Sequence, residues 1–190
     1  MKKIILLFYI LSTLIFSVES SMSDENKNLL YLDLEYGRVV IEMKPEVAPG
    51  HVERIKKLVS EGLYDGVVFH RVIDGFMAQT GDVSFGNSQN ENFNIDRAGT
   101  GGSKYPDLKA EFSKLNHGRG AVSMARTQDP NSANSQFFIC FGDASFLNEQ
   151  YTVWGQVIEG MEFVDKIKRG DGSSGSVSDP DKIIKMQLAE

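Results

Sequence analysis

The residues best suited to chemistry lie in one short stretch, residues 69–82 (FHRVIDGFMAQTGD). The stretch predicts two short strands joined by a tight Asp-Gly turn. Because side chains alternate along a strand, we expect Arg71 to share a face with Phe69 and His70 to point the other way. A guanidinium beside apolar surface is costly to desolvate. Arg71 is therefore the first candidate for a functional cation.

Nucleophilic and metal-assisted catalysis lack the residues that they need. The three histidines, His51, His70 and His117, fall in a predicted helix, strand and loop, without the spacing of a metal site. The single cysteine, Cys140, adds no ligand pair, and no serine lies in a Gly-x-Ser-x-Gly turn. Asp82, like the other aspartates of this region, stands beside a glycine, which predicts a solvated turn. We therefore expect neither a metal ion nor a cofactor.

A later strand carries a second set of polar and aromatic side chains. Within residues 136–141 (QFFICF), alternation places Gln136 and Phe138 on one face. It places Phe137 and Ile139 on the opposite face. One set can pack inward while the other lines a groove.

Together these side chains suit an extended peptide. Met77 and Gln79 share a face after the turn. The amides of Gln79 and Gln136 match backbone groups, and aromatic side chains match a flat apolar ring. Three apolar residues belong to the set, although each alone is more often found in a core: Phe76, Met124 and Phe138. Combined with Arg71, they favour a groove.

The remaining pattern predicts a mainly β domain with two helices. Further strands are predicted at residues 30–34, 39–43, 120–126, 152–158 and 183–188. Apolar residues at helical spacing predict helices over 52–59 and 161–167. Because most strands follow one another without an intervening helix, an antiparallel barrel is favoured over a parallel α/β sheet. The Gly- and Asn-rich residues 83–118 predict a long loop that walls a binding groove.

The N-terminus has the form of a secretory signal peptide. Two lysines precede an uncharged, mostly apolar run at 4–18, and small and polar residues follow. The run is short for a membrane span, which needs about 20 residues, and an uncleaved anchor is the alternative. We divide the chain into a signal peptide at 1–20, a flexible leader at 21–28 and one domain at 29–190.

The net charge and the cysteine content limit which binding partners and which thiol chemistry we expect. The formal net charge of −6 over 190 residues argues against nucleic acid, whose backbone selects basic surfaces. The lone Cys140 has no cysteine to pair with and lies in an apolar strand, so we expect it to be buried and inert. We expect a monomer without stable membrane association after signal cleavage.

Four motifs, in this order, resemble the cyclophilin peptidyl-prolyl cis–trans isomerases: FHRVIDGFMAQTGD, GRGAVSMAR, NSANSQFFICF and FLNEQYTVWGQVIEGMEFVDKI. The resemblance runs from about Leu30 to the C-terminus. It implies a closed eight-stranded antiparallel β-barrel capped by two α-helices, with the substrate groove on its outer face. The loop at 83–118 is most similar to bacterial members, which together with the signal peptide suggests the periplasm.

The resemblance also implies roles for single residues. Arg71 matches the catalytic arginine, and His70 matches a histidine beside the pocket. The pocket for the proline ring corresponds to Phe76, Met77, Phe138 and Leu147. The amides that contact substrate backbone correspond to Gln79 and Gln136, and the segment that pairs with the peptide corresponds to Ala125 and Arg126. Phe146 stands where many members carry Trp, and Tyr151 where they often carry His, so we expect a reshaped rim and weak cyclosporin binding.

The function implied is acceleration of X-Pro bond rotation in proline-containing polypeptides that are folding or exported. A non-catalytic binder or chaperone for proline segments is the alternative. A hydrolase hidden in the Gly-rich loops is a third possibility, and it predicts a bell-shaped pH profile.

Overall fold

The computed structural model describes residues 28–189, so the predicted signal peptide and nearly all of the leader lie outside the described residues. The strands are β1 (Leu29–Leu34), β2 (Gly37–Met43), β3 (Arg71–Ile73), β4 (Met77–Thr80), β5 (Ala121–Met124), β6 (Phe137–Cys140), β7 (Val153–Glu159) and β8 (Lys185–Leu188). The helices are α2 (Pro49–Ser60) and α3 (Met161–Val164), with a short 3-10 helix, η1 (Ser145–Leu147). Within these residues no helix is long and apolar enough to cross a membrane.

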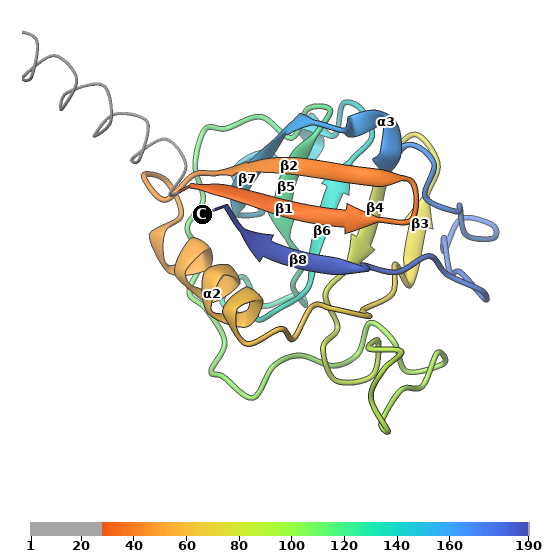
Figure 1. Cartoon of the computed structure of the whole chain (residues 1–190). Coiled ribbons are helices and arrows are strands. Elements are labelled where there is room, and N and C mark those ends of the chain that lie inside the picture. Colours follow the sequence, from red (N-terminus) through yellow and green to blue (C-terminus); the bar gives the residue numbers. More distant parts are fainter. Residues whose placement is uncertain (1–27, 190) are drawn as a thin grey trace, which may run out of the picture.

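The eight strands form one curled antiparallel sheet in the order β3-β4-β6-β5-β7-β2-β1-β8 (Figure 1). Its end strands, β3 and β8, are joined only through the segments that precede them. There the Phe69 N–H donates to the Asp181 carbonyl at 2.8 Å, and the Ile183 N–H donates to the Val67 carbonyl at 2.9 Å. The predicted mainly β, eight-stranded antiparallel architecture is confirmed, although "closed" overstates how the two ends meet.

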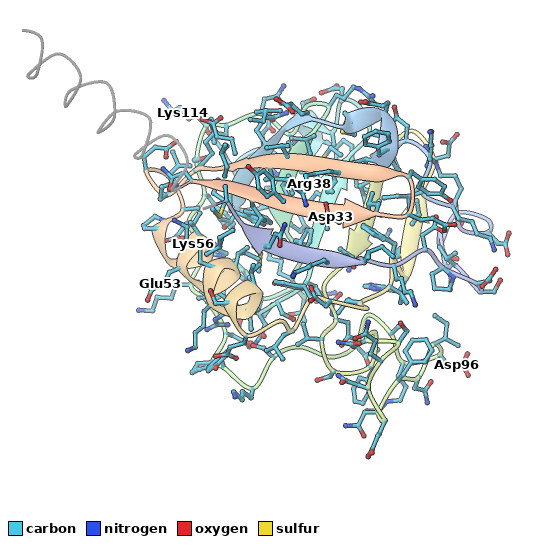
Figure 2. The ribbon with its side chains drawn as sticks, in the orientation of Figure 1. Asp33, Arg38, Glu53, Lys56, Asp96 and Lys114 are labelled. Carbon is cyan, nitrogen blue, oxygen red and sulfur yellow. The ribbon has the colours of Figure 1, made fainter. Side chains whose placement is uncertain are left out.

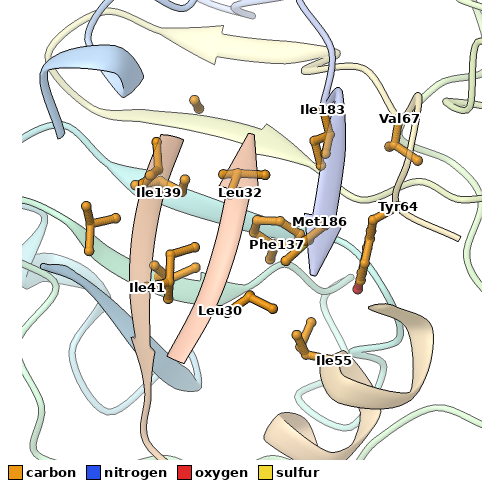
Figure 3. Close-up of a cluster of buried hydrophobic side chains, with 14 of the residues drawn as sticks. Leu30, Leu32, Ile41, Ile55, Tyr64, Val67, Phe137, Ile139, Ile183 and Met186 are labelled. Carbon is orange, nitrogen blue, oxygen red and sulfur yellow. The ribbon is translucent and has the colours of Figure 1, made fainter. Parts of the chain in front are cut away.

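The core lies inside the curl of the sheet. Along β1, Leu30, Leu32 and Leu34 are buried and alternate with partly exposed residues, as a strand with one wet face requires. From α2, Ile55 packs against the same core, and Figure 3 shows it beside Leu30. Burying each such side chain contributes about 1.5–3 kcal/mol.

The outer faces of the sheet and of α2 carry charge. On β1 and β2, Arg38 donates twice to Asp33, from Nε at 2.7 Å and from Nη2 at 3.0 Å (Figure 2). On α2, Glu53 is exposed and Lys56 is half-buried, and neither belongs to the buried face of the helix (Figure 2).

Helix α2 is capped by the long loop rather than by its own N-cap residue. Ala48 makes no side-chain cap bond. Instead Glu111, from the loop at 83–118, accepts from the N–H groups of Gly50 at 3.0 Å and His51 at 3.1 Å. The His51 ring also contacts this carboxylate, Nδ1 to Oε2, at 2.6 Å. The loop is therefore tied to the domain by hydrogen bonds to a helix terminus.

The second helix is shorter than the sequence predicts. Apolar spacing predicted 161–167, whereas α3 ends at Val164. Beyond it the Lys166 and Ile167 N–H groups bond three residues back, which is the 3-10 pattern. Val164 and Ile167 are nevertheless both buried, so the apolar periodicity correctly predicted that these two residues face the core.

Candidate active site

A hollow of about 320 Å³ lies on the outer face of the sheet. We call it the apolar hollow because most of its lining side chains are apolar, although two arginines and a glutamine also line it. Its walls come from β3, β4 and β6, from the residues after β5, and from the segment that contains η1. It is lined by Arg71, Phe76, Met77, Gln79, Ala125, Arg126, Phe138, Phe146, Leu147 and Tyr151. All ten are residues that the sequence placed at the site.

Strand register explains why these side chains meet. Arg71 of β3 pairs with Gln79 of β4, and Gln79 pairs in turn with Phe138 of β6. Directly paired residues in antiparallel strands project to the same face. The expected common face of Met77 with Gln79, and of Gln136 with Phe138, is also present.

The floor of the apolar hollow is a small packed cluster. Met77 and Phe138 are 1% and 5% exposed and pack with Cys140 beneath them. Burial raises the pKa of the Cys140 thiol to about 12, which leaves it protonated at neutral pH, in agreement with its predicted inertness. The floor is therefore packed and uncharged.

Aromatic rings build the rim. The Tyr151 ring meets Phe138 edge to face, with centroids 6.0 Å apart. Phe146 is 65% exposed, and its ring centroid lies 5.4 Å from that of Phe76. The rim is thus open to solvent at Phe146.

Three side chains form a hydrogen-bonded line across the groove, which we call the polar row: Arg71, Gln79 and Gln136. Arg71 Nη1 donates to Gln79 Oε1 at 3.3 Å, and Gln79 Nε2 donates to Gln136 Oε1 at 3.0 Å. At one end Gln136 Nε2 donates to the carbonyls of Gly99 at 3.0 Å and Gly101 at 2.8 Å.

The other end of the polar row is held by a second loop. Arg71 Nε donates to the Ser174 carbonyl at 3.0 Å. The guanidinium is therefore held from two sides, by an amide and by a backbone carbonyl.

A polar hollow of about 550 Å³ adjoins the apolar one. The loop at 99–103 forms one wall. Gln79, Ala125 and Arg126 line both hollows, and Gln136 lines only the polar one. The two hollows are therefore adjoining halves of one groove, and the polar row runs from one to the other with Gln79 at their border.

Two predicted site residues lie away from the groove surface. Met124 is buried in the core, paired with Phe137 in the sheet, so its side chain faces the interior. His70 is 7% exposed and lies against Gly99, where a Cβ would come within 2.8 Å of its ring. Burial, opposed in part by Asp82, lowers the pKa of His70 to about 4. His70 is thus neutral at pH 7 and lies behind the polar half.

The prediction that Arg71 shares a face with Phe69 is wrong. Phe69 packs in the core with Val67 and Val72, whereas Arg71 lines the groove. Because β3 begins only at Arg71, the alternation shifts by one residue between Phe69 and Val72.

A sequence model of one family, described as cyclophilin type peptidyl-prolyl cis-trans isomerase/CLD, matches residues 29–188. The chain belongs to this family. A probable peptidyl-prolyl cis-trans isomerase of Brucella suis is 58% identical over 173 residues, which cover 90% of this chain and 88% of that protein. Peptidyl-prolyl cis-trans isomerase B of Bacillus subtilis is 39% identical over 74% of this chain and 91% of its own length.

Solved cyclophilins share the architecture. AquaCyp293 from Hirschia baltica superposes with a TM-score of 0.73 at 27% identity, covering 86% of this chain and 74% of that one. A cyclophilin-type isomerase of Cryptosporidium parvum, determined in the presence of the dipeptide Ala-Pro, gives a TM-score of 0.72 at 25% identity over 85% and 99% of the two chains.

The parts of this cyclophilin site that sequence reasoning missed are mostly backbone atoms. The carbonyls of Gly99, Gly101 and Ser174 hold the ends of the polar row. A carbonyl is present at every residue, so no side-chain pattern marks these three. The contacts of Asp82, which accepts from the N–H groups of Gly99 and Gly101, were also missed, because a neighbouring glycine suggested a solvated turn.

Proposed function

We propose that this cyclophilin accelerates cis–trans rotation of X-Pro bonds in folding or exported polypeptides, with Arg71 stabilising the twisted amide. The observation that carries the proposal is the position of the Arg71 guanidinium, which lines an apolar hollow of about 320 Å³ and is held by Gln79. An apolar hollow of this kind suits the ring of proline, and a fixed cation beside it suits the bond that precedes the ring.

The chemistry requires only differential binding. Resonance sets a barrier of about 18–20 kcal/mol to rotation of the peptide bond. Twisting localises the lone pair on the prolyl nitrogen, which makes this atom a better hydrogen-bond acceptor. A guanidinium aimed at it binds the twisted state more tightly than the planar state. Each 1.36 kcal/mol of such selectivity accelerates rotation about tenfold.

The rest of the groove holds the peptide while the bond turns. Phe76, Met77, Phe138 and Leu147 surround the ring, and Ala125 with Arg126 borders the chain on either side of it. Both amide hydrogens of Gln136 are already given to carbonyls, so this residue offers the substrate only its oxygen. Gln79 keeps one free N–H for a substrate carbonyl.

A coupled isomerisation assay on an X-Pro test peptide tests this assignment. Arg71→Ala should fold normally and lose at least about tenfold in kcat/KM. The matched control is Arg38→Ala, because Arg38 is an exposed arginine paired with Asp33 outside the groove, and this variant should retain activity. Near-full activity of folded Arg71→Ala would reject the role of Arg71 and favour the proline-segment binder.

The pH profile separates isomerase from hydrolase. A hydrolase base would titrate and give a bell-shaped profile. The histidine nearest Arg71 in sequence is His70. Because its pKa is about 4, His70 does not change its protonation state between about pH 6 and 9. Isomerisation should therefore be flat from about pH 6 to 9.

We also propose that the protein is exported to the periplasm of a Gram-negative bacterium and acts there as a monomer. Support for export comes from the basic, apolar and small-residue pattern of residues 1–20. Expression in a Gram-negative host should give a shortened protein in the periplasmic fraction, monomeric by light scattering. Full-length protein retained in the membrane fraction would indicate the uncleaved anchor instead.

A further inference from the structure

Asp82 is a fully buried carboxylate that lines neither hollow. Its Oδ1 accepts from the N–H groups of Ser84 at 3.0 Å and Phe85 at 2.9 Å. Its Oδ2 accepts from the N–H groups of Gly99 and Gly101, both at 2.8 Å. A buried charge is tolerated only when hydrogen bonds replace its lost water, and here four backbone donors do so.

The two glycines bound by Asp82 are the ones that hold Gln136. Their N–H groups point to the carboxylate, and their carbonyls accept from Gln136 Nε2. A Cβ on Gly101 would lie 2.6 Å from Asp82 Oδ1, so the loop approaches the carboxylate as closely as glycine permits. The N–H group and the carbonyl of each glycine flank the same Cα, so releasing the two N–H groups also leaves the carbonyls less firmly held.

The carbonyls fix the orientation of each amide in the polar row. Because a carbonyl only accepts, Gln136 must turn its NH₂ group toward the loop and its oxygen toward Gln79. Gln79 must then present its NH₂ group to Gln136 and its own oxygen to Arg71. Because Arg71 can only donate, the loop carbonyls and the guanidinium require the same orientation of the two amides.

We propose that Asp82 is a positioning residue for Arg71, acting through the loop at 99–101 and the polar row. The proposal rests on the assignment of Arg71 as the residue that stabilises the twisted amide. It requires a carboxylate at this position rather than an amide of the same shape. In Asp82→Asn, the NH₂ group of the amide would replace one carboxylate oxygen. It would face either the N–H groups of Ser84 and Phe85 or those of Gly99 and Gly101, and because two donors cannot bond to each other, that pair of hydrogen bonds would be lost.

The first measurement is kcat and KM of Asp82→Asn with an X-Pro peptide. Since misplacement by about 1 Å can cost a hundredfold, kcat should fall at least about fivefold, while KM changes less than about twofold. The control is Glu111→Gln, which also removes a carboxylate that accepts two backbone N–H groups, but at α2. This control should lose stability and keep kcat.

A double-mutant cycle identifies the route. If Asp82 acts through Gln136, adding Asp82→Asn to Gln136→Ala should lower kcat no further. Should Asp82→Asn fail to fold, Gly101→Ala disturbs the same contact with the carboxylate retained, and it should also lower kcat. Wild-type kcat in these folded variants, or an undiminished effect in the Gln136→Ala background, would overturn the proposal. Arg71→Ala serves as the reference. If Arg71→Ala is fully active, the proposed role of Arg71 is wrong. If Arg71→Ala is impaired while Asp82→Asn and Gly101→Ala are not, only the proposed role of Asp82 is wrong.

Discussion

The two halves of the groove are built in different ways. The apolar hollow is made of side chains from paired strands, packed on Met77, Phe138 and Cys140. The polar hollow has a wall of loop backbone at 99–103, which is held by two buried or half-buried side chains, Asp82 and Asn134. The shape of the apolar half is therefore determined mainly by the packed strands of the sheet. The shape of the polar half depends on a few hydrogen bonds.

This difference separates binding from turnover. The apolar half supplies most of the surface that can hold a proline ring, so its disruption should weaken binding and stability together. The polar half sets the direction of Arg71 through hydrogen bonds, which are sensitive to small displacements. Its disruption should slow rotation of the bond more than it weakens binding.

The largest effect is expected from Phe138→Ala in the apolar half. Removing this buried ring should cost about 3–5 kcal/mol of unfolding free energy and abolish measurable peptide binding. Urea denaturation and peptide titration measure the two quantities. Phe141→Ala is the control, since Phe141 is equally buried but packs in the core, and it should lose stability while keeping peptide affinity. Equal affinities of the two folded variants would remove the distinction between the halves.

A smaller effect is expected from His70, which lies behind the polar half. Because its pKa is about 4 in the folded protein and about 6.5 when unfolded, the unfolded chain takes up the proton first as pH falls. Stability is complete above pH 6.5 and decreases toward pH 4. Between pH 7.5 and 5 the loss should be about 2 kcal/mol.

Urea unfolding of wild type and His70→Gln at both pH values measures this contribution. The variant should show a shallower decline with falling pH. His51 and His117, whose pKa values are also lowered mainly by burial, remain in both proteins and cancel in the comparison. Identical declines would show that His70 is not held neutral by the fold.

The smallest effect is expected from Gly175→Ala in the loop that holds Arg71 Nε. Gly175 has φ +71, and a Cβ there would lie 2.4 Å from Ile73 Cγ1, so the neighbouring Ser174 carbonyl should shift. We expect kcat/KM to fall about threefold and stability by about 1 kcal/mol. Gly172→Ala is the control, because its φ of +58 gives similar strain with nothing within 4 Å. Matching kcat/KM values would exclude a role for this contact.

The sheet could be predicted from local alternation, whereas the apolar half needed the resemblance to cyclophilins as well, which supplied Phe146, Leu147 and Tyr151. Leu30, Leu32 and Leu34 show the period of a half-buried strand, and the same rule placed Gln79 beside Met77. The rule fails where the strand is irregular, and Phe69 therefore lies in the core while Arg71 lies in the groove. Met124 follows its strand into the core, which does not support a side-chain contact with substrate.

Gln79, Gln136 and a groove-walling loop at 83–118 were predicted for the polar half. The hydrogen bonds that hold this half could not be predicted, because they join residues far apart in the chain. Asp82 does close a local turn with Ser84 and Phe85, as its glycine neighbour suggested. It is nevertheless buried, with its second oxygen accepting from the N–H groups of Gly99 and Gly101. These partners lie 17 and 19 residues away, so the residues next to Asp82 do not predict them. The roles of the site residues in catalysis stay predictions.

The most direct test of the central claim compares binding with turnover in Arg71→Ala and Arg71→Lys. Exchange NMR on an X-Pro peptide yields both the dissociation constant and the rotation rate on the enzyme. We predict dissociation constants within about threefold of wild type and a rate at least about tenfold lower, with Lys restoring little because it lacks the planar fork. A loss of rate no larger than the loss of binding would contradict the claim that Arg71 favours the twisted amide.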